Sequence, residues 1–538
     1  MRLRANILLF VPLLMLFFVQ SLWADEYITD NVDCDGYKRV LVATAEGTCL
    51  GLVVQKSADY KFVKPRKIIQ TANKAQFLIT DMGGWNPHRG ILWLLDMSAA
   101  KPKLTALLTK LNLPHGLAMD SRGRFYVGEK QQIFRFSLHN GRVENKQVVV
   151  SNLPDWQGHR HPLTHFVFDN QQNLIVNTAA PSDQCKKNVK ADKSCGELKQ
   201  HNSINASLRK YFYDPKNDVW RQQYEILATG LRNSMALAQH KSGTLLQAEN
   251  NMDFDGLHTP FEEINVIEKG KFYGWPYCYD KNSINPFWKA AAKKYCLQSN
   301  EYQEPWVVIS PHSAPLDMMY YQGTKFPELN GKLILSWHGY RGTGHRLVSY
   351  DVDDLGRPQR VNKAVYRLDP VGRNTAFKQQ EFPASLAAAQ AKEIVTEWNA
   401  IAGVRPRGRP VGMTVADDGA IWVLDDVNRA VLRLSRGLAY GKRQSANIRA
   451  NGIHVADNKA ANLFKQQCSS CHINIMDEEK VYLPSSWLQC TDKKRLLRVR
   501  LFGSVLPRMP PDKDLNSTEK TIFEQWLKQY NKEHRKSN

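Results

Sequence analysis

The chain has 538 residues, of which 43% are hydrophobic and 23% charged. This globular composition excludes a wholly disordered or collagen-like chain, and the length favours more than one domain. Lysine and arginine outnumber the acidic residues by 73 to 52, giving a formal net charge of +21. Such a charge suits a polyanion, a membrane surface or an acidic protein, without choosing among them.

The first 24 residues have the three parts of a secretory signal peptide. Arg2 and Arg4 form a basic start, residues 7–19 are apolar, and Ala24 is a small residue before the expected cleavage point. The apolar run is shorter than the roughly 20 residues that span a bilayer, so cleavage is favoured over a retained anchor. We therefore expect a periplasmic or secreted protein, where disulfides form and no nucleic acid is met.

Residues 25–440 repeat one pattern, an apolar segment, a polar turn and a second β-rich run. The copies occupy 77–96, 116–129, 165–178, 234–249, 317–338 and 412–426. Each predicts a hairpin of the two inner strands of a blade, and six copies predict an all-β six-bladed β-propeller. Seven blades and a β-sandwich are the alternatives.

Two segments depart from this pattern. Residues 384–403 are rich in alanine and have helical spacing, which predicts a helix inserted before the last copy. Residues 441–454 have no strand pattern and are interpreted as a linker.

The C-terminal residues 455–538 carry a haem-attachment motif. Cys468 and Cys471 have the CxxCH spacing that forms two thioethers to haem, and His472 follows as an iron ligand. A redox CxxC or half of a zinc site would need a βαβ context or a second ligand pair, and neither pattern follows. The motif predicts covalently bound haem c.

The sequence around the motif fits a small all-α cytochrome c domain. Residues 456–467 and 518–532 have helical patterns, and Met509 lies in a proline-stiffened loop between them. A methionine thioether is a usual sixth iron ligand in electron-transfer haems. Met509 is preferred over Met476, which lies too close to the attachment site.

The nine cysteines can then be divided. Two bind haem, one (Cys490) remains alone, and six form local pairs that could each be a disulfide. The expected pairs are Cys34 with Cys49, Cys185 with Cys195, and Cys278 with Cys296.

Residues 230–279 resemble a known family. They contain GLRN at 230–233, EIN at 263–265 and YGWP at 273–276, in that order. This stretch closely resembles the soluble pyrroloquinoline quinone (PQQ)-dependent glucose/sorbosone dehydrogenases. The resemblance implies a six-bladed propeller that binds PQQ and oxidises sugar hydroxyls.

The resemblance also implies catalytic roles. His161 occupies the position of the family's base, with His159 and His165 as neighbouring alternatives. An imidazole suits proton removal from a hydroxyl group. Arg232 and Asn233 match the family's Arg-Asn pair, and the arginine would stabilise negative charge on the reduced quinone.

Cofactor contacts follow from the same resemblance. Arg407 and Arg409 match an RxR pair before the last blade, and guanidinium groups suit the carboxylates of PQQ. The family also has a lysine after a fifth-blade strand, whereas this chain has His338 and Arg341 there.

A calcium ion is also implied, beside the quinone. The corresponding loop contains Asn250 and Asn251, and oxygen ligands suit Ca²⁺. In the family this ion is held largely by backbone carbonyls.

The sequence therefore predicts a PQQ-dependent dehydrogenase of a sugar, polyol or aldehyde. Electrons would pass to its own haem and then to an external cytochrome, copper protein or respiratory acceptor. Basic segments such as 493–500 could dock that partner or touch a membrane surface. The alternatives are a quinone-free ligand-binding propeller with a cytochrome carrier or sensor, and a propeller lactonase-type hydrolase.

Overall fold

The computed structural model describes most of the propeller and part of the C-terminal segment. The described residues are 27, 29–155, 160–187, 190, 194–200, 203–256, 258–339, 343–368, 378–395, 398, 408–440, 452–467, 476–477, 480–484 and 515–533. The signal peptide, His159, Arg341, Arg407, the CxxCH motif, Cys490 and Met509 lie outside these residues, so those predictions stay predictions.

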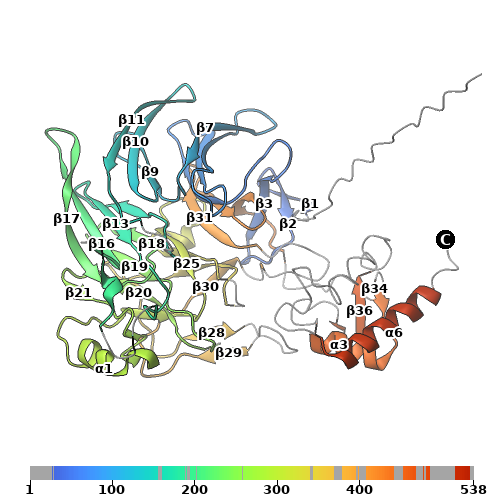
Figure 1. Cartoon of the computed structure of the whole chain (residues 1–538). Coiled ribbons are helices and arrows are strands. Elements are labelled where there is room, and N and C mark those ends of the chain that lie inside the picture. Colours follow the sequence, from blue (N-terminus) through green and yellow to red (C-terminus); the bar gives the residue numbers. More distant parts are fainter. Residues whose placement is uncertain are drawn as a thin grey trace, which may run out of the picture.

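Six antiparallel sheets form the blades of a propeller (Figure 1). The first three, from the inner strand outward, are β4 (Pro65–Gln70), β5 (Gln76–Asp81), β6 (Gly90–Asp96) and β7 (Lys103–Leu111); β8 (Leu117–Met119), β9 (Phe125–Glu129), β10 (Gln132–His139) and β11 (Arg142–Val150); and β12 (Phe166–Phe168), β13 (Leu174–Thr178), β16 (Ser207–Asp214) and β17 (Val219–Thr229). The all-β six-bladed prediction is confirmed.

The other three blades complete the ring. They are β18 (Ala236–Gln239), β19 (Leu245–Glu249), β20 (Glu262–Val266) and β24 (Val307–Ile309); β25 (Pro315–Tyr320), β26 (Leu333–Trp337), β27 (Arg346–Tyr350) and β30 (Lys392–Val395); and β31 (Pro410–Val415), β32 (Ile421–Asp425), β33 (Ala430–Arg436) and β3 (Thr48–Gln55). Strands β2 (Tyr37–Val40) and β1 (Thr29–Cys34) extend the last sheet.

The last blade joins the two ends of the propeller sequence. Strand β3 pairs antiparallel with β33, with Thr48 opposite Arg436 and Gln55 opposite Ala430. A strand from the start of the chain thus completes the sheet that the end of the propeller begins. Pairing of this kind removes two open sheet edges and closes the ring.

Two expectations are corrected. The described part of the expected helix, residues 384–395 and 398, is not helical: Ala388 bridges to Val308 and Val361, and 392–395 are strand β30, the outer strand of the fifth blade. Pairing with neighbouring strands thus outweighs the helical propensity of this alanine-rich segment. The copy at 77–96 corresponds to the second and third strands of its blade, since β4 is the inner strand.

Short elements occupy the connections. They are β14 (Lys199–Gln200), β15 (Ser203–Ile204), β21 (Lys271–Phe272), β22 (Cys278–Tyr279), β23 (Ser283–Ile284), β28 (Val365–Leu368), β29 (Lys378–Glu381), α1 (Lys289–Ala292) and the short turns Gly196–Leu198, Pro286–Trp288, Lys293–Leu297 and Pro327–Leu329. No helix among the described residues has the length and apolar character needed to cross a bilayer.

The two helices expected in the C-terminal segment are present. Helix α3 (Asn458–Gln467) contacts helix α6 (Ser517–Glu533), where the ring of Phe464 lies 4.8 Å from that of Phe523 and 5.2 Å from that of Trp526. Strands β34 (Gly452–His454), β35 (Met476–Asp477) and β36 (Lys480–Pro484) form a small sheet in the same segment.

All three predicted disulfides are formed. They join Cys34 with Cys49, Cys185 with Cys195, and Cys278 with Cys296. The last two lie in one buried cluster of aromatic and small residues. That cluster packs around the long connections of the third and fourth blades.

The strand directions define one functional end of the propeller. In every blade the inner strand begins, and the second strand ends, at the same end of the ring. We call this end the site face. The loops that precede inner strands and follow second strands are therefore gathered there, and such loops carry binding and catalytic residues in many folds.

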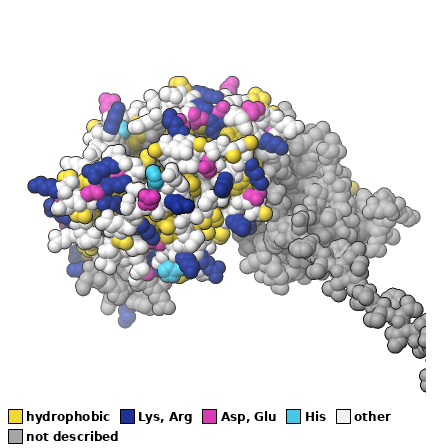
Figure 2. Space-filling view, turned by 90° about the horizontal axis from the view of Figure 1, so that it is seen from above, with side chains coloured by type: hydrophobic (Ala, Val, Ile, Leu, Met, Phe, Trp, Pro, Cys, Tyr) yellow, Lys and Arg dark blue, Asp and Glu magenta, His cyan; other side chains and the backbone are white. Residues whose placement is uncertain are grey.

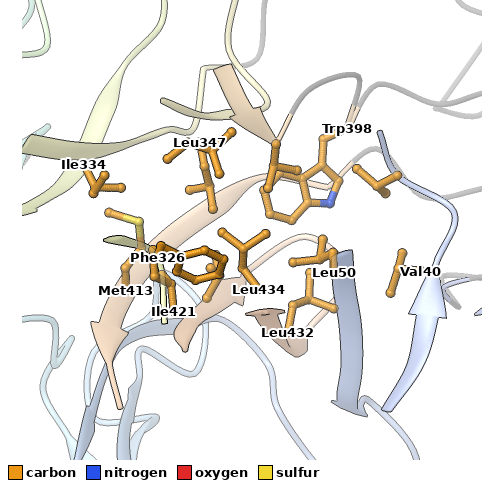
Figure 3. Packing of buried hydrophobic residues seen from close by; sticks show 14 of the residues in the cluster. Val40, Leu50, Phe326, Ile334, Leu347, Trp398, Met413, Ile421, Leu432 and Leu434 are labelled. Carbon is orange, nitrogen blue, oxygen red and sulfur yellow. The ribbon is translucent and has the colours of Figure 1, made fainter. Parts of the chain in front are cut away.

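The core of the closing blade is continuous with its neighbour (Figure 3). Leu50 of β3 and Leu432 of β33 are fully buried beside Trp398, and Ile334 and Leu347 come from the fifth blade. Ring closure is therefore stabilised by side-chain packing as well as by backbone pairing.

Replacement of Leu50 by alanine should weaken this closure. Because the side chain is fully buried, Leu50→Ala should lower the free energy of unfolding by about 3 kcal/mol. Urea unfolding followed by tryptophan fluorescence measures the change. Leu52→Ala, at a half-buried position on the same strand, is the matched control and should cost clearly less. Equal losses would contradict the importance of the closing core.

Candidate active site

His161 and Arg232 are brought together by a single intervening residue, Ala180. The backbone N–H of Ala180 donates to the carbonyl oxygen of Arg232 at 2.7 Å, and its own carbonyl lies 2.8 Å from Nδ1 of His161. The segments before β12 and β18 are thereby held by the loop after β13. The contact to Ala180 is made by the backbone of Arg232, so it links the two segments and leaves the guanidinium group to other partners.

The carbonyl of Ala180 also decides the tautomer of a neutral His161. A carbonyl oxygen only accepts, so Nδ1 must carry the proton and donate it. The neutral ring then has its lone pair on Nε2. The sequence did not contain this information, because the partner is a backbone atom of a neighbouring loop.

Arg232 is held by the loops after β13 and β19. Its guanidinium forms a 2.7 Å ion pair with Asp183 and donates to the carbonyl of Asn250 at 2.8 Å, while Asp253 lies 3.5 Å away. The arginine is only 5% exposed. Its position is therefore fixed from two sides, and its charge is partly balanced by Asp183.

Asn233 has an unsatisfied polar atom. Its backbone N–H donates to Glu249 at 2.8 Å, but its buried side-chain Oδ1 has no hydrogen-bond partner among the described residues. Burial raises the pKa of Glu249 to about 7. An orphaned amide oxygen costs free energy unless a ligand or water satisfies it, so this atom is a candidate contact.

Asn250 and Asn251 use their side chains to shape the loop. The amide of Asn250 donates to the carbonyl of Pro315 at 2.8 Å, and that of Asn251 donates to the carbonyl of Phe261 and to Glu263, each at 3.1 Å. The Asn250 carbonyl already accepts from Arg232. These contacts fix the loop through the two side-chain amide N–H groups and the Asn250 carbonyl, and they do not test the predicted calcium ligation.

Beneath this loop lies a second buried carboxyl group. Glu262 accepts the backbone N–H of Asn251 at 2.6 Å and that of Ala314 at 3.2 Å, and burial raises its pKa to about 8. Across all described residues, no group of three or more His, Cys, Asp or Glu side chains is arranged to hold a metal ion.

A second polar group lies on the same face, around Asp426. Asp426 is buried and contacts Arg66 at 2.7 Å, His338 Nε2 at 2.9 Å and Lys64 at 3.3 Å. Burial opposes ionisation, yet His338, Arg66 and Lys64 hold the pKa of Asp426 well below its usual range. Asp426 is therefore ionised.

His338 occupies the place where the family has a lysine. Burial lowers its pKa against the attraction of Asp426, so the ring is neutral near pH 7. The positive charge of Arg409 acts on it in the same direction. A lysine is nevertheless present, because the ammonium group of Lys64 reaches Asp426 from the start of β4.

Two histidines, His115 and His165, lie next to the polar group around Asp426 and are connected to it through Arg66. Nε of Arg66 donates to Nδ1 of His115 at 3.2 Å, and the His115 ring lies edge-on to His165 at 5.6 Å. Burial, assisted by Lys67, lowers the pKa of His165 to about 3. His165 is 3% exposed, and its Nδ1 has no partner among the described residues.

A small apolar cluster underlies the site face. Met82, Leu113, Leu163 and Met235 pack together and are all buried. Leu163 is two residues from His161, and Met235 is two residues from Asn233. The cluster therefore connects the loop after β5 with the segments that carry the predicted base and the Arg-Asn pair.

Comparison with known proteins fits this geometry. Residues 121–353 match the family model of Glucose / Sorbosone dehydrogenase. The matched segment contains His161, Arg232, Asn233, Asn250 and Asn251, whereas Arg409 lies beyond it. The resemblance found in residues 230–279 is thus confirmed for the middle of the propeller.

A similar curated protein is the pyrroloquinoline quinone-dependent pyranose dehydrogenase of Coprinopsis cinerea. It is 26% identical over 316 residues, a match that covers 46% of this chain and 43% of that protein. The chain thus spans less than half the length of this relative.

Two solved structures have the same fold. A Trichoderma reesei member of carbohydrate-active enzyme family AA12 superposes with a TM-score of 0.54 and 18% identity, over 76% of this chain and 100% of the other. The PQQ domain of the Coprinopsis cinerea pyranose dehydrogenase superposes with a TM-score of 0.53 and 17% identity, over 75% of this chain and 100% of the other. At this identity they establish the propeller fold.

Several site residues were missed by sequence reasoning. Lys64, Arg66, His115, Asp183 and Asp426 all contribute side chains to the contacts above. One signal could have found two of them, because the basic run 64–67 lies at the start of an inner strand, as the run 405–409 lies before another. The remaining three have no distinctive local pattern.

The buried His165 should make stability depend on pH. Its folded-state pKa of about 3 lies below the unfolded value near 6.5, so the stability it contributes is present above pH 6.5 and lost as the pH falls towards 3. When the pH is lowered from 7 to 4.5, the free energy of unfolding of His165→Gln should therefore fall by about 2 kcal/mol less than that of the wild type. Urea unfolding at both pH values measures this, with the exposed His139→Gln as control. An unchanged pH dependence in His165→Gln would contradict the assignment.

Proposed function

We propose that this protein is a quinoprotein dehydrogenase that oxidises a sugar or a related polyol or aldehyde. PQQ would be its cofactor, and electrons would pass through a C-terminal haem c to an external acceptor. The observation that carries the proposal is the junction at Ala180, which joins a histidine of fixed tautomer to a buried arginine. Both residues lie within the segment that matches the dehydrogenase family model.

His161 is the proposed general base. Oxidation of a CH–OH group requires removal of the hydroxyl proton as hydride leaves the carbon. In the neutral ring, Nδ1 donates to the Ala180 carbonyl, so Nε2 is the atom that can take this proton. His165 is a poorer candidate because it is almost fully buried and resists protonation down to a pH of about 3.

The residues present fit an anionic cofactor. Lys64 and Arg66 contact Asp426, Arg409 acts on the neighbouring His338, and the carboxylate of Asp81 also acts on Arg66. Cationic groups of this kind are suited to bind the carboxylates of a tricarboxylate such as PQQ. Arg407, outside the described residues, is proposed to act with Arg409.

When bound, PQQ would accept the hydride from the substrate carbon. On the protein side, the Arg232 guanidinium is fixed by Asp183 and by the carbonyl of Asn250, and it is proposed to stabilise negative charge on the reduced cofactor. The orphaned Oδ1 of Asn233 would gain a partner from the cofactor or the substrate. Calcium, held by backbone carbonyls of the 250–251 loop, is proposed as a second bound group.

The haem assignment rests on the CxxCH motif at 468–472 and on Met509 as axial ligand. It is supported by helix α3, which ends one residue before Cys468 and packs against helix α6. A carrier on the same chain would make the first electron transfer intramolecular. The external acceptor would be a cytochrome, a copper protein or a respiratory component.

Periplasmic or secreted location is proposed from the signal-peptide pattern and is supported by the three disulfides. On the side shown in Figure 2, the Lys and Arg side chains of the described residues do not form one basic patch. They are interspersed with acidic and apolar side chains, despite the formal net charge of +21. Docking to a partner or a membrane surface through that charge is proposed only for the C-terminal basic segments.

The proposal is tested by haem reduction. Purified protein with haem c attached is loaded with PQQ and Ca²⁺, and the haem absorbance is followed with a panel of aldoses, ketoses and polyols. His161→Ala should lower kcat by 10²- to 10⁴-fold, because the base is lost, while PQQ still binds. Binding is measured separately by titration of PQQ fluorescence.

Two outcomes would contradict this function. If wild type binds no PQQ and no sugar reduces the haem, the dehydrogenase proposal fails, and a ligand-binding propeller or a hydrolase becomes the better description. If His161→Ala keeps full turnover, the base lies elsewhere, and His165→Gln is the next variant to measure.

Removal of the two haem-attaching thiols should separate sugar oxidation from electron transfer through the haem. Cys468→Ser/Cys471→Ser should lose covalent haem on a denaturing gel, because neither thioether can form. PQQ-dependent sugar oxidation should persist with a soluble dye as acceptor. Cys490→Ser is the matched control and should keep its haem. Haem retained in the double variant would contradict the attachment site.

A further inference from the structure

Trp85 is unusually exposed. Its side chain is 59% exposed, whereas the other tryptophans of the described residues are buried or half-buried. No ring contact or hydrogen bond involves it within the described part of the chain. Tryptophan combines a large apolar ring with an N–H donor and is enriched at interfaces, so this exposed side chain is a candidate ligand contact.

The loop that carries Trp85 is held tightly at its base. The N–H of Gly83 donates to Asp81 at 2.9 Å, and Asp81 also accepts from the N–H groups of Val63 and Lys64. Gly83 has a φ of +68°, and a Cβ there would lie 2.0 Å from the carbonyl oxygen of Arg89. The two ends of the loop thus meet closely, which presents Trp85 on a fixed support.

The loop begins next to the segments that carry the proposed base and the Arg-Asn pair. Met82 packs with Leu163 and Met235, the neighbours of the base and of the Arg-Asn pair. At most roughly 11 Å of chain separates the Cα atoms of Met82 and Trp85. The loop also follows second strand β5, so it belongs to the site face.

We propose that Trp85 is a stacking platform for a pyranose ring of the substrate. One face of a pyranose presents several C–H groups, which pack well on the face of an indole, while its hydroxyl groups remain hydrogen-bonded elsewhere. An acyclic polyol has no such rigid face. Trp85 would therefore make the site prefer a cyclic sugar over an open-chain polyol.

This inference rests on the proposed dehydrogenase function and adds a specificity-determining residue to it. Trp85 lies outside residues 121–353, so the family match does not assign it a role. Its proposed role also differs from those of the base and cofactor residues, since the ring would contact the substrate away from the reacting atoms.

The test compares a cyclic and an acyclic substrate in the PQQ-loaded holoenzyme. Trp85→Ala should raise the KM for D-glucose by about tenfold with kcat nearly unchanged, and should leave the KM for D-sorbitol within about twofold. Trp85→Phe should restore part of the glucose affinity. Methyl α-D-glucopyranoside, used as a competitive ligand, should lose affinity by a similar factor.

The control is Leu438→Ala. Leu438 is 67% exposed and follows the end of β33, at the end of the propeller opposite the site face, so its loss should change neither KM. An unchanged glucose KM in Trp85→Ala would overturn the proposal. A fall only in the rate of haem reduction would also overturn it, since Trp85 would then serve electron transfer. If wild type oxidises no sugar, the dehydrogenase function itself fails.

Discussion

Pairing of β3 with β33 is the constraint on which the molecule depends. It fixes the number of blades and holds all inner strands in one ring, so that their starts meet at a common end. The proposed base precedes the third inner strand, the Arg-Asn pair precedes the fourth, and Arg409 precedes the sixth. An open stack of the same hairpins would spread these residues along an edge. Ring closure is therefore also a condition for the site.

Within that ring, backbone groups position the reacting side chains. Ala180 orients His161 and fixes the segment of Arg232, and the carbonyl of Asn250 holds the guanidinium group. Backbone partners suit this purpose because they are neutral and do not titrate. Charged side chains are concentrated around Asp426, where Lys64 and Arg66 pair with its carboxylate.

The sequence predicted much of the architecture, for identifiable physical reasons. Alternating strands and glycine-containing turns report local conformation, so the six copies and the three disulfides were recovered. The helix expected at 384–403 was wrong for its described residues because neighbouring strands pair with them: Ala388 bridges to Val308 and Val361, and 392–395 pair with β27. The missing family lysine was sought near His338, whereas Lys64 reaches the same neighbourhood from a distant blade.

By itself the sequence determined the repeat, the haem-attachment motif and the identity of the candidate base, arginines and asparagines, because each depends on spacing along the chain. Only the tertiary structure decided which nitrogen of a neutral His161 holds the proton, which residues surround Asp426, and that Trp85 is exposed on a loop of the site face. Those properties depend on contacts between blades far apart in sequence, and burial and partner choice arise only once the ring has closed.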